Sequence, residues 1–159
     1  MFKKLKGEDI VKPFDKILTA IDFSENSELA FDYAVAMATQ FNSELTILHV
    51  INEPVDLRGF YVPHISFEQL EKEIEEGAAK MMETFCSTKL GSFSNYQSVI
   101  VSGIPYEEIT RKADEIGASL IILGTHGRTG LDHILFGSTA ERVVRSAACP
   151  VMTIRLPSV

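Results

Sequence analysis

The amino-acid sequence predicts an α/β fold, with one open, five-stranded parallel sheet and helices on both of its faces. Five short segments rich in apolar and β-branched residues alternate with four segments that carry helical patterns. Strict alternation favours a parallel sheet, because right-handed crossovers place each intervening helix on one face of the sheet or the other. The chain has 159 residues, 45% of them hydrophobic, which suits one domain with a substantial core. We expect this domain over residues 14–159, after an N-terminal extension at residues 1–13.

The first 50 residues predict a strand, a helix and a second strand. Residues 16–22 (KILTAID) and 45–50 (LTILHV) are short, apolar and β-branched, as expected for strands covered on both faces. Ser24 precedes the helical segment and is placed to be its N-cap. Spacings of three and four residues predict one buried helix face, made of Leu29, Ala30, Tyr33, Ala34, Met37 and Ala38.

The alternation continues after a long connection. Residues 51–65 carry Pro54, Gly59 and Pro63, which predicts an irregular surface loop of a kind that often covers a site. Ser66 begins a capping box, and the charged helix that follows continues to about residue 89. The remaining predicted elements are a strand at 96–101, a helix from 103–105 to about 116, a strand at 119–123, a helix at 138–146 and a strand at 151–154.

Charge and hydropathy argue against nucleic-acid and membrane partners. The formal net charge is −7 and the isoelectric point is near 5.1, whereas phosphodiester backbones are bound by clustered Lys and Arg. No apolar run approaches the roughly 18 residues of a membrane span, and no apolar segment follows the basic residues at the start of the chain. We expect a soluble, cytoplasmic protein.

Cysteine and histidine positions do not suggest a metal centre. Cys86 and Cys149 lie in different predicted elements without CxxC spacing, so we expect free, buried thiols. The histidines show neither HxxxH nor HExxH spacing. We therefore interpret His49 as a core or rim residue and His126 as a loop-shaping residue, and we assign His133 no metal or general-base role.

The stretch GTHGRTGLDHILFGSTAERVV, residues 124–144, holds four glycines between a predicted strand and a predicted helix. Glycines let the backbone approach a ligand closely, and a helix start offers unpaired N–H groups and a positive dipole end. The N–H groups of Gly137 and Ser138, with the hydroxyls of Ser138 and Thr139, could hydrogen-bond phosphate oxygens, and Arg128 could add charge. A second interpretation is that the glycines only end the strand and shape a turn.

We expect this stretch to share a pocket with the first connection from strand to helix. Ligands of open α/β sheets bind beyond the carboxyl ends of the strands, where the strand order reverses. The segment at 22–27 leaves the first strand at the same edge if the first and fourth strands are neighbours. The later loop lacks the GK[ST] ending of a P-loop, and segment 22–27 contains no glycine, so neither common phosphate motif fits.

These features resemble the universal stress protein family. ATP-binding members carry Gly, two residues, Gly, nine residues, then Gly followed by Ser or Thr, and Gly124, Gly127, Gly137 and Ser138 reproduce that pattern. The likeness extends from about Phe14 to Arg155, through DKILTAIDFSENSELAFDYA, LTILHV, ASLIILGTHGRTG and CPVMTIR. It implies a Rossmann-like fold, similar to the adenine nucleotide alpha hydrolases, and a site for ATP with Mg²⁺.

The resemblance also implies roles for particular residues. It places Asp22 at the adenosine and metal side of the site, whereas the residues alone are equally consistent with an acid at a helix N-terminus beside Ser24. Some relatives have Pro-Thr at the two preceding positions, a small departure that leaves backbone contacts possible. The other implied nucleotide-binding residues are Ala20, Ile21, Val50 against adenine, Leu123 beside Gly124, and Gly127, Gly130, Gly137, Ser138 and Thr139 along the ribose and phosphates.

The last predicted strand, residues 151–154, is short, apolar and placed at the edge of the sheet, where an unpaired backbone is a liability. Universal stress proteins commonly dimerise through this strand. The resemblance therefore implies a homodimer with an isologous contact that buries Val151 and Ile154. A monomer with a covered edge is the alternative.

Three classes of function stay open at this point. The first is an ATP-binding, nucleotide-responsive homodimer with at most slow hydrolysis or autophosphorylation, which fits the full glycine pattern. The second is a dimeric interaction module without nucleotide, although such relatives usually lose that pattern. The third is an enzyme, either a weak ATPase or a nucleotidyl transferase, yet the sequence shows no Ser-His-Asp or Cys-His order, no evident catalytic base and no HxGH-type signature.

Overall fold

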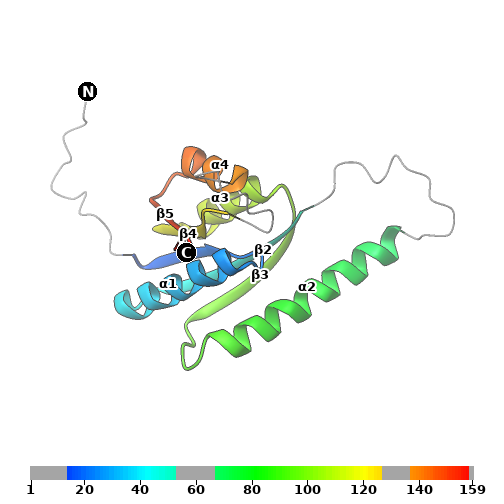
Figure 1. Ribbon diagram of the computed structural model, residues 1–159, viewed down its shortest axis with the longest axis horizontal. Helices are drawn as coiled ribbons and strands as arrows, with labels where there is room; N and C mark the ends of the chain where they lie inside the picture. Colours follow the sequence, from blue (N-terminus) through cyan, green and yellow to red (C-terminus); the bar gives the residue numbers. More distant parts are fainter. Residues whose placement is uncertain (1–13, 53–66, 127–136, 158–159) are drawn as a thin grey trace.

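The computed structural model describes residues 14–52, 67–126 and 137–157 of the chain. Figure 1 shows the elements in their predicted alternation. They are β1 (Lys16–Ala20), α1 (Glu25–Phe41), β2 (Glu44–Asn52), α2 (Phe67–Lys89), β3 (Tyr96–Gly103), α3 (Pro105–Ile116), β4 (Leu120–Gly124), α4 (Ser138–Ser146) and β5 (Val151–Ile154). The extension at 1–13, residues 53–65 of the predicted loop and Ser66 of the capping box lie outside the described residues.

The five strands form one sheet in the order β3-β2-β1-β4-β5, and every neighbouring pair is parallel. The predicted open parallel sheet is therefore confirmed. β1 lies in the middle, with Ala20 opposite Leu48 of β2 on one side and opposite Leu123 of β4 on the other. The chain builds outward from β1 to β3 and then crosses back to β4, so the strand order reverses between β1 and β4.

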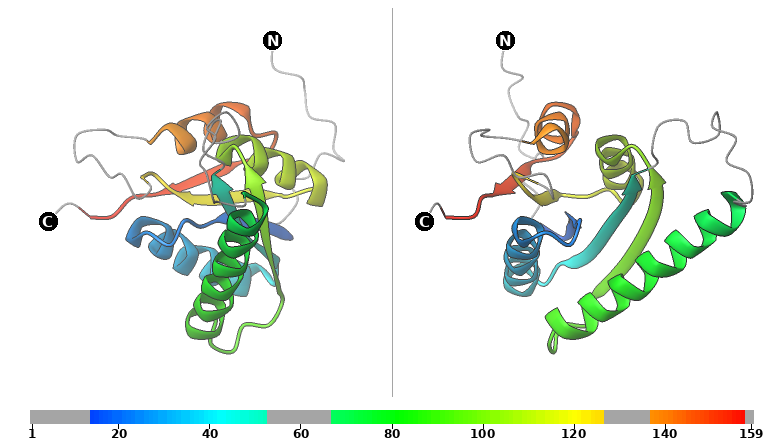
Figure 2. Two further views of the ribbon diagram at one scale, coloured as in Figure 1. Left: turned by 90° about the vertical axis from the view of Figure 1, so that its right-hand side faces the viewer. Right: turned by 45° about the vertical axis from the view of Figure 1, so that its right-hand side comes forward.

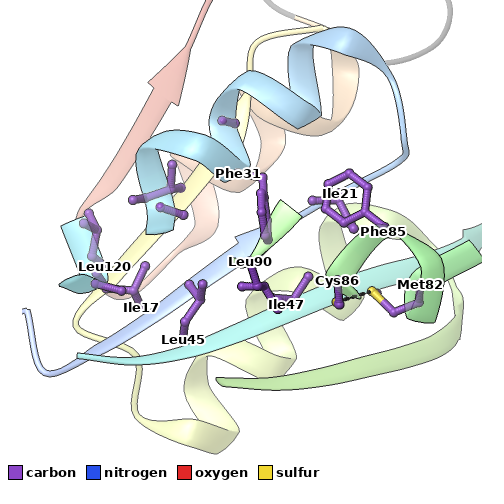
Figure 3. Close-up of a cluster of buried hydrophobic side chains, with 14 residues drawn as sticks. Ile17, Ile21, Phe31, Leu45, Ile47, Met82, Phe85, Cys86, Leu90 and Leu120 are labelled. Atoms are coloured by element: carbon purple, nitrogen blue, oxygen red, sulfur yellow. Dashed lines mark hydrogen bonds between the residues drawn. The ribbon is translucent and has the colours of Figure 1, made fainter. Parts of the chain in front are cut away.

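Each face of the sheet buries its own hydrophobic cluster. Ile17 and Ile47 pack with Phe31 of α1 and Phe85 of α2 on one face, as Figure 3 shows. Leu18 and Leu48 belong to the cluster on the other face, which includes residues of α3 and α4. Figure 2 shows the same division, with α1 and α2 on one side of the sheet and α3 and α4 on the other. The alternation of side chains along each strand directs neighbouring residues to opposite faces.

Helix α1 begins where the sequence indicated, but its buried face differs in part from the predicted one. The Ser24 side chain accepts a hydrogen bond from the Ser27 N–H at 3.3 Å, which confirms Ser24 as the N-cap. Ala30, Ala34 and Ala38 are buried as predicted. Tyr33 is 50% exposed, and Phe31 is fully buried in the cluster between α1 and α2. Ser27 and Phe31 complete the buried face with the three alanines, and the predicted assignment of Tyr33 to it was wrong.

The ends of β1 and β2 differ from the predicted ones, and both cysteines are free thiols. β1 ends at Ala20, so Ile21 and Asp22 lie in the turn after the strand, and β2 continues to Asn52 beyond the predicted end. Cys86 is buried and Cys149 is half-buried, and both are free. Burial raises the pKa of both thiols, which keeps them protonated at neutral pH. In the described ranges, no helix is both long enough and apolar enough to span a membrane.

Candidate functional site

A pocket of about 640 Å³ opens at the carboxyl end of the sheet, where the strand order reverses. β1, β2 and β4 end at its floor, while the starts of α3 and α4 and the middle of α2 form its walls. This is the position that open parallel sheets offer to a ligand, because helix starts and loop residues converge there. The volume is in the range of small-molecule sites.

The structure brings together every predicted site residue that it describes. The lining includes Ala20, Ile21, Asp22, Val50, Leu123, Gly124, Gly137, Ser138 and Thr139. The expectation that segment 22–27 and the start of α4 share one pocket follows from the pairing of β1 with β4. Gly127, Arg128 and Gly130 lie outside the described residues, so their expected roles stay predictions.

The start of α4 differs from expectation at one amide. The Gly137 N–H donates to the Thr125 carbonyl at 2.7 Å, so this group, expected to be available to phosphate, is already bonded within the protein. The next amides, those of Ser138, Thr139 and Ala140, precede the first intrahelical bond, which runs from Glu141 N–H to the Gly137 carbonyl. None of these three amides has an acceptor among the described residues. The donors that α4 offers to the pocket therefore begin one residue later than predicted.

Close backbone contacts explain why two residues at the carboxyl end of the sheet are glycines. A Cβ added to Gly124 would lie 3.0 Å from the backbone of Asn26 in α1, and one added to Gly137 would lie 3.2 Å from the Thr125 carbonyl oxygen. Neither glycine has a positive φ. Their role within the protein is thus to let α1 and α4 approach the end of β4, which is a packing role and differs from the shaping of a turn. A role beside a ligand is compatible with that packing, because both still line the pocket.

The turn after β1 is fixed by its own polar groups. Oδ1 of Asp22 accepts hydrogen bonds from the Ser24 N–H at 3.0 Å and from the Ser24 hydroxyl at 2.5 Å. The Asp22 N–H donates to the Ser27 hydroxyl at 3.3 Å. The carboxylate therefore lies beside the N-terminus of α1, as one of its two interpretations predicted, and it also lines the pocket.

His49 of β2 contacts two residues of this turn, Ile21 and Phe23. The Ile21 carbonyl can only accept, so Nδ1 of His49, 2.8 Å away, is the donor of their hydrogen bond. Phe23 adopts φ 62°, a left-handed conformation that is unfavourable for a non-glycine residue. Its ring contacts the rings of His49 and Phe85, with centroids 4.7 and 5.6 Å away. His49 was predicted to be a core or rim residue; it is half-buried and lines the pocket, and it contacts Ile21 and Phe23.

The other histidine near the site contacts its neighbour. Nδ1 of His126 lies 3.0 Å from the Thr125 hydroxyl at the end of β4, and both residues line the pocket. Within the described ranges, no group of three or more His, Cys, Asp or Glu side chains is arranged to hold a metal ion. His133 lies outside those ranges.

Sequence reasoning missed one whole wall of the pocket. Ile74, Gly77, Ala78 and Met81 of α2 line it, together with Asn52 at the end of β2. The segment reads in the sequence as a charged helix, and its position over the pocket depends on the tertiary packing of α2. The apolar residues Ile74 and Met81, seven residues apart and therefore on one face of the helix, were the available signal.

The fold and the pocket together define an open α/β protein with a ligand-sized site at the point where its strand order reverses. A sequence profile described as the universal stress protein family matches residues 13–155. The chain therefore belongs to the universal stress protein family. The universal stress protein YxiE of Bacillus subtilis is 34% identical over 147 residues, which cover 89% of this chain and 99% of that protein.

Solved structures agree with this assignment. Universal stress protein MJ0577 of Methanocaldococcus jannaschii is 31% identical over 154 residues, covering 89% of this chain and 95% of that protein. Its solved structure superposes with a TM-score of 0.80 over 93% of this chain and 100% of that chain, at 32% identity. The universal stress protein from Archaeoglobus fulgidus in complex with dAMP shares the fold, with a TM-score of 0.62 and 20% identity over 90% of this chain and 99% of that chain.

Proposed function

We propose that this protein binds ATP together with Mg²⁺ in the pocket at the carboxyl end of the sheet, and that it acts in the cytoplasm as a nucleotide-responsive homodimer. The observation that carries the proposal is the convergence of the α4 amides, the Asp22 turn and an apolar wall on one pocket of about 640 Å³. The dAMP complex of the Archaeoglobus fulgidus relative supports an adenine nucleotide as the ligand class.

The residues of the pocket fit the parts of such a ligand. The amides of Ser138, Thr139 and Ala140 lie at the positive end of the α4 dipole, where phosphate oxygens are favourable partners. The hydroxyls of Ser138 and Thr139 add donors at the same place. Val50 and Leu123 give apolar surface at the ends of β2 and β4, which suits an adenine ring.

Magnesium would be bound with the nucleotide rather than by a protein cluster. Asp22 is the carboxylate of the pocket lining, and Mg²⁺ commonly takes one or two carboxylates together with phosphates and water. When bound, the ion neutralises phosphate charge. Oδ1 of Asp22 already accepts from Ser24, so the carboxylate is oriented by the turn before any ligand binds. We assign no catalytic residue, and any hydrolysis would be slow.

The experiment that tests this function uses the full-length purified protein. Denaturation followed by mass spectrometry of the released small molecules should detect an adenine nucleotide, and calorimetric titration with ATP and Mg²⁺ should give a saturable signal. Titration with magnesium alone should give none. If neither method detects an adenine nucleotide, the proposed function is wrong.

The edge strand β5 is the surface we propose for dimerisation. The carbonyls of Pro150 and Ile154 accept from β4, through the Ile121 N–H at 3.0 Å and the Thr125 N–H at 2.8 Å. Because strand groups alternate in direction, the N–H and C=O groups of the intervening Val151 and Thr153 point to the open edge. An antiparallel contact with a second copy would pair these groups.

Thr153→Pro tests this interface without removing a bond to β4. Proline lacks the N–H that faces the open edge, and edge strands tolerate it at such positions. We expect light scattering coupled to size exclusion to show a monomer for Thr153→Pro and a dimer for the wild type and for Thr153→Val, which keeps the N–H. A dimer that persists in a folded Thr153→Pro protein contradicts the interface.

A further inference from the structure

The apolar wall that α2 presents to the pocket contains a glycine for which the described residues give no structural reason. Gly77 lies in the middle of α2, and a Cβ added to it would meet no heavy atom of the described chain within 4 Å. Its φ is not positive. A glycine in a helix interior is less stable than alanine, so neither packing nor backbone conformation favours glycine at this position.

The two other glycines described along the pocket differ in this respect. Gly124 and Gly137 have no side chain because the backbones of Asn26 and Thr125 come within 3.0 and 3.2 Å of an added Cβ. At Gly77 the space beside the backbone belongs to the pocket itself, since Gly77 lines it. A side chain there would occupy volume that a ligand could otherwise fill.

Large apolar side chains flank this gap. Ile74 precedes Gly77 by three residues and Met81 follows it by four, so all three share one face of α2. Ile74 is 44% exposed and Met81 is 45% exposed, and both line the pocket. The three residues form a notch, a short stretch of bare helix backbone between two apolar side chains.

We propose that the notch receives the planar base of the nucleotide, with the base lying against the Gly77 backbone between Ile74 and Met81 and also contacting Val50 and Leu123 of the same pocket lining. The inference rests on the proposed function, which assigns the phosphates to the start of α4. A flat, apolar face matches a notch of this shape, whereas charged groups would lose hydration against Ile74 and Met81. Gly77 is therefore a specificity-determining residue, because its missing side chain sets the room for the base.

Filling the notch tests the proposal, and Ala79 supplies a matched control. Gly77→Leu should lower ATP affinity at least about tenfold, and Gly77→Ala about threefold. Gly77→Ala should at the same time raise Tm by about 2 °C, because alanine favours the helix. Ala79 lies two residues along α2, about 200° around the helix, and lines a separate cavity of about 370 Å³ against β3. Ala79→Leu should leave ATP affinity within twofold.

A second measurement does not depend on any variant. In the wild-type protein saturated with ATP, isotope-filtered NMR should show contacts between the base protons and the Met81 methyl group, and none to the methyl group of Met152 in β5. Wild-type binding of ATP without Met81 contacts, or with full affinity in a folded Gly77→Leu protein, overturns the notch while the proposed function stands. Failure of the wild type to bind ATP overturns the proposed function first and the notch with it.

Discussion

The two ends of the pocket are built from different chemistry. At the α4 end, backbone amides, hydroxyls and the Asp22 turn dominate, and two glycines allow tight packing of the backbone. At the α2 end, the notch presents apolar side chains around an open gap. Under the proposed function, one end would select for charge and the other for shape, so a ligand that satisfies both would join a polyanion to a flat, uncharged group.

A negative charge at the start of α4 should have the largest effect. Ser138→Asp places a carboxylate among the amides proposed to hold phosphate, so we expect ATP affinity to fall about a hundredfold through repulsion and competition for the same donors. Helix stability should not suffer, because an acid in the first turn is favourable with the dipole. Calorimetry and a thermal melt give the two quantities.

The control for this change lies at the other end of the same helix. Ser146→Asp adds the same charge to an exposed residue that does not line the pocket, and ATP affinity should stay within about twofold. Adenosine carries no phosphate, so its binding should be the same for Ser138→Asp and the wild type. Equal losses of ATP and adenosine affinity in Ser138→Asp would show that the α4 end does not select for charge.

His49 contacts the turn that carries Asp22, and its replacement should have an intermediate effect. His49→Leu removes the hydrogen bond to the Ile21 carbonyl, which frees the turn that carries Asp22, and we expect ATP affinity to fall about tenfold. His49→Asn retains a donor near the position of Nδ1 and should recover most of that affinity. Both variants lose the ring contact with Phe23, which should cost each about 1 kcal/mol of unfolding free energy, and His49→Leu should lose about 1 kcal/mol more with the hydrogen bond to the Ile21 carbonyl.

A loss of ATP affinity in His49→Leu that His49→Asn recovers would identify His49 as a positioning residue. A role limited to packing would lower stability and affinity in parallel, and His49→Asn would then bind ATP as weakly as His49→Leu. The thermal melts and the titrations should be performed on the same protein preparations, so that the two losses can be compared directly.

The two ends of the pocket also differ in how well the sequence predicts them. Glycine spacing and the strand pattern predicted the α4 end of the pocket. These signals are local, because β4 and α4 are consecutive elements of the chain. The bond from Gly137 N–H to Thr125 could not be predicted, since it depends on how α4 folds back onto β4. The notch was missed because its residues become part of the pocket only when α2 packs beside the end of β2.

Side-chain burial on α1 gives a second example. The alanines follow the helical period, and the sequence placed them correctly. Tyr33 shares their spacing closely enough to be included, but it is exposed, and the large buried residue of α1 is Phe31, whose ring contacts Phe85 of α2. Periodicity specifies which direction a helix faces, and the neighbouring helix decides which large residue fits.

The smallest expected effect comes from trimming the notch instead of filling it. Ile74→Ala removes part of an apolar contact with the base, and because the side chain is already 44% exposed, the loss should be about threefold in affinity. ATP and adenosine should lose affinity equally, since both carry the base. Val144 of α4 is 48% exposed and does not line the pocket, so Val144→Ala is the matched control and should bind both ligands like the wild type. If Ile74→Ala weakened ATP but not adenosine, the α2 end would be contributing to phosphate binding, and the division of the pocket into a charge-selecting end and a shape-selecting end would be wrong.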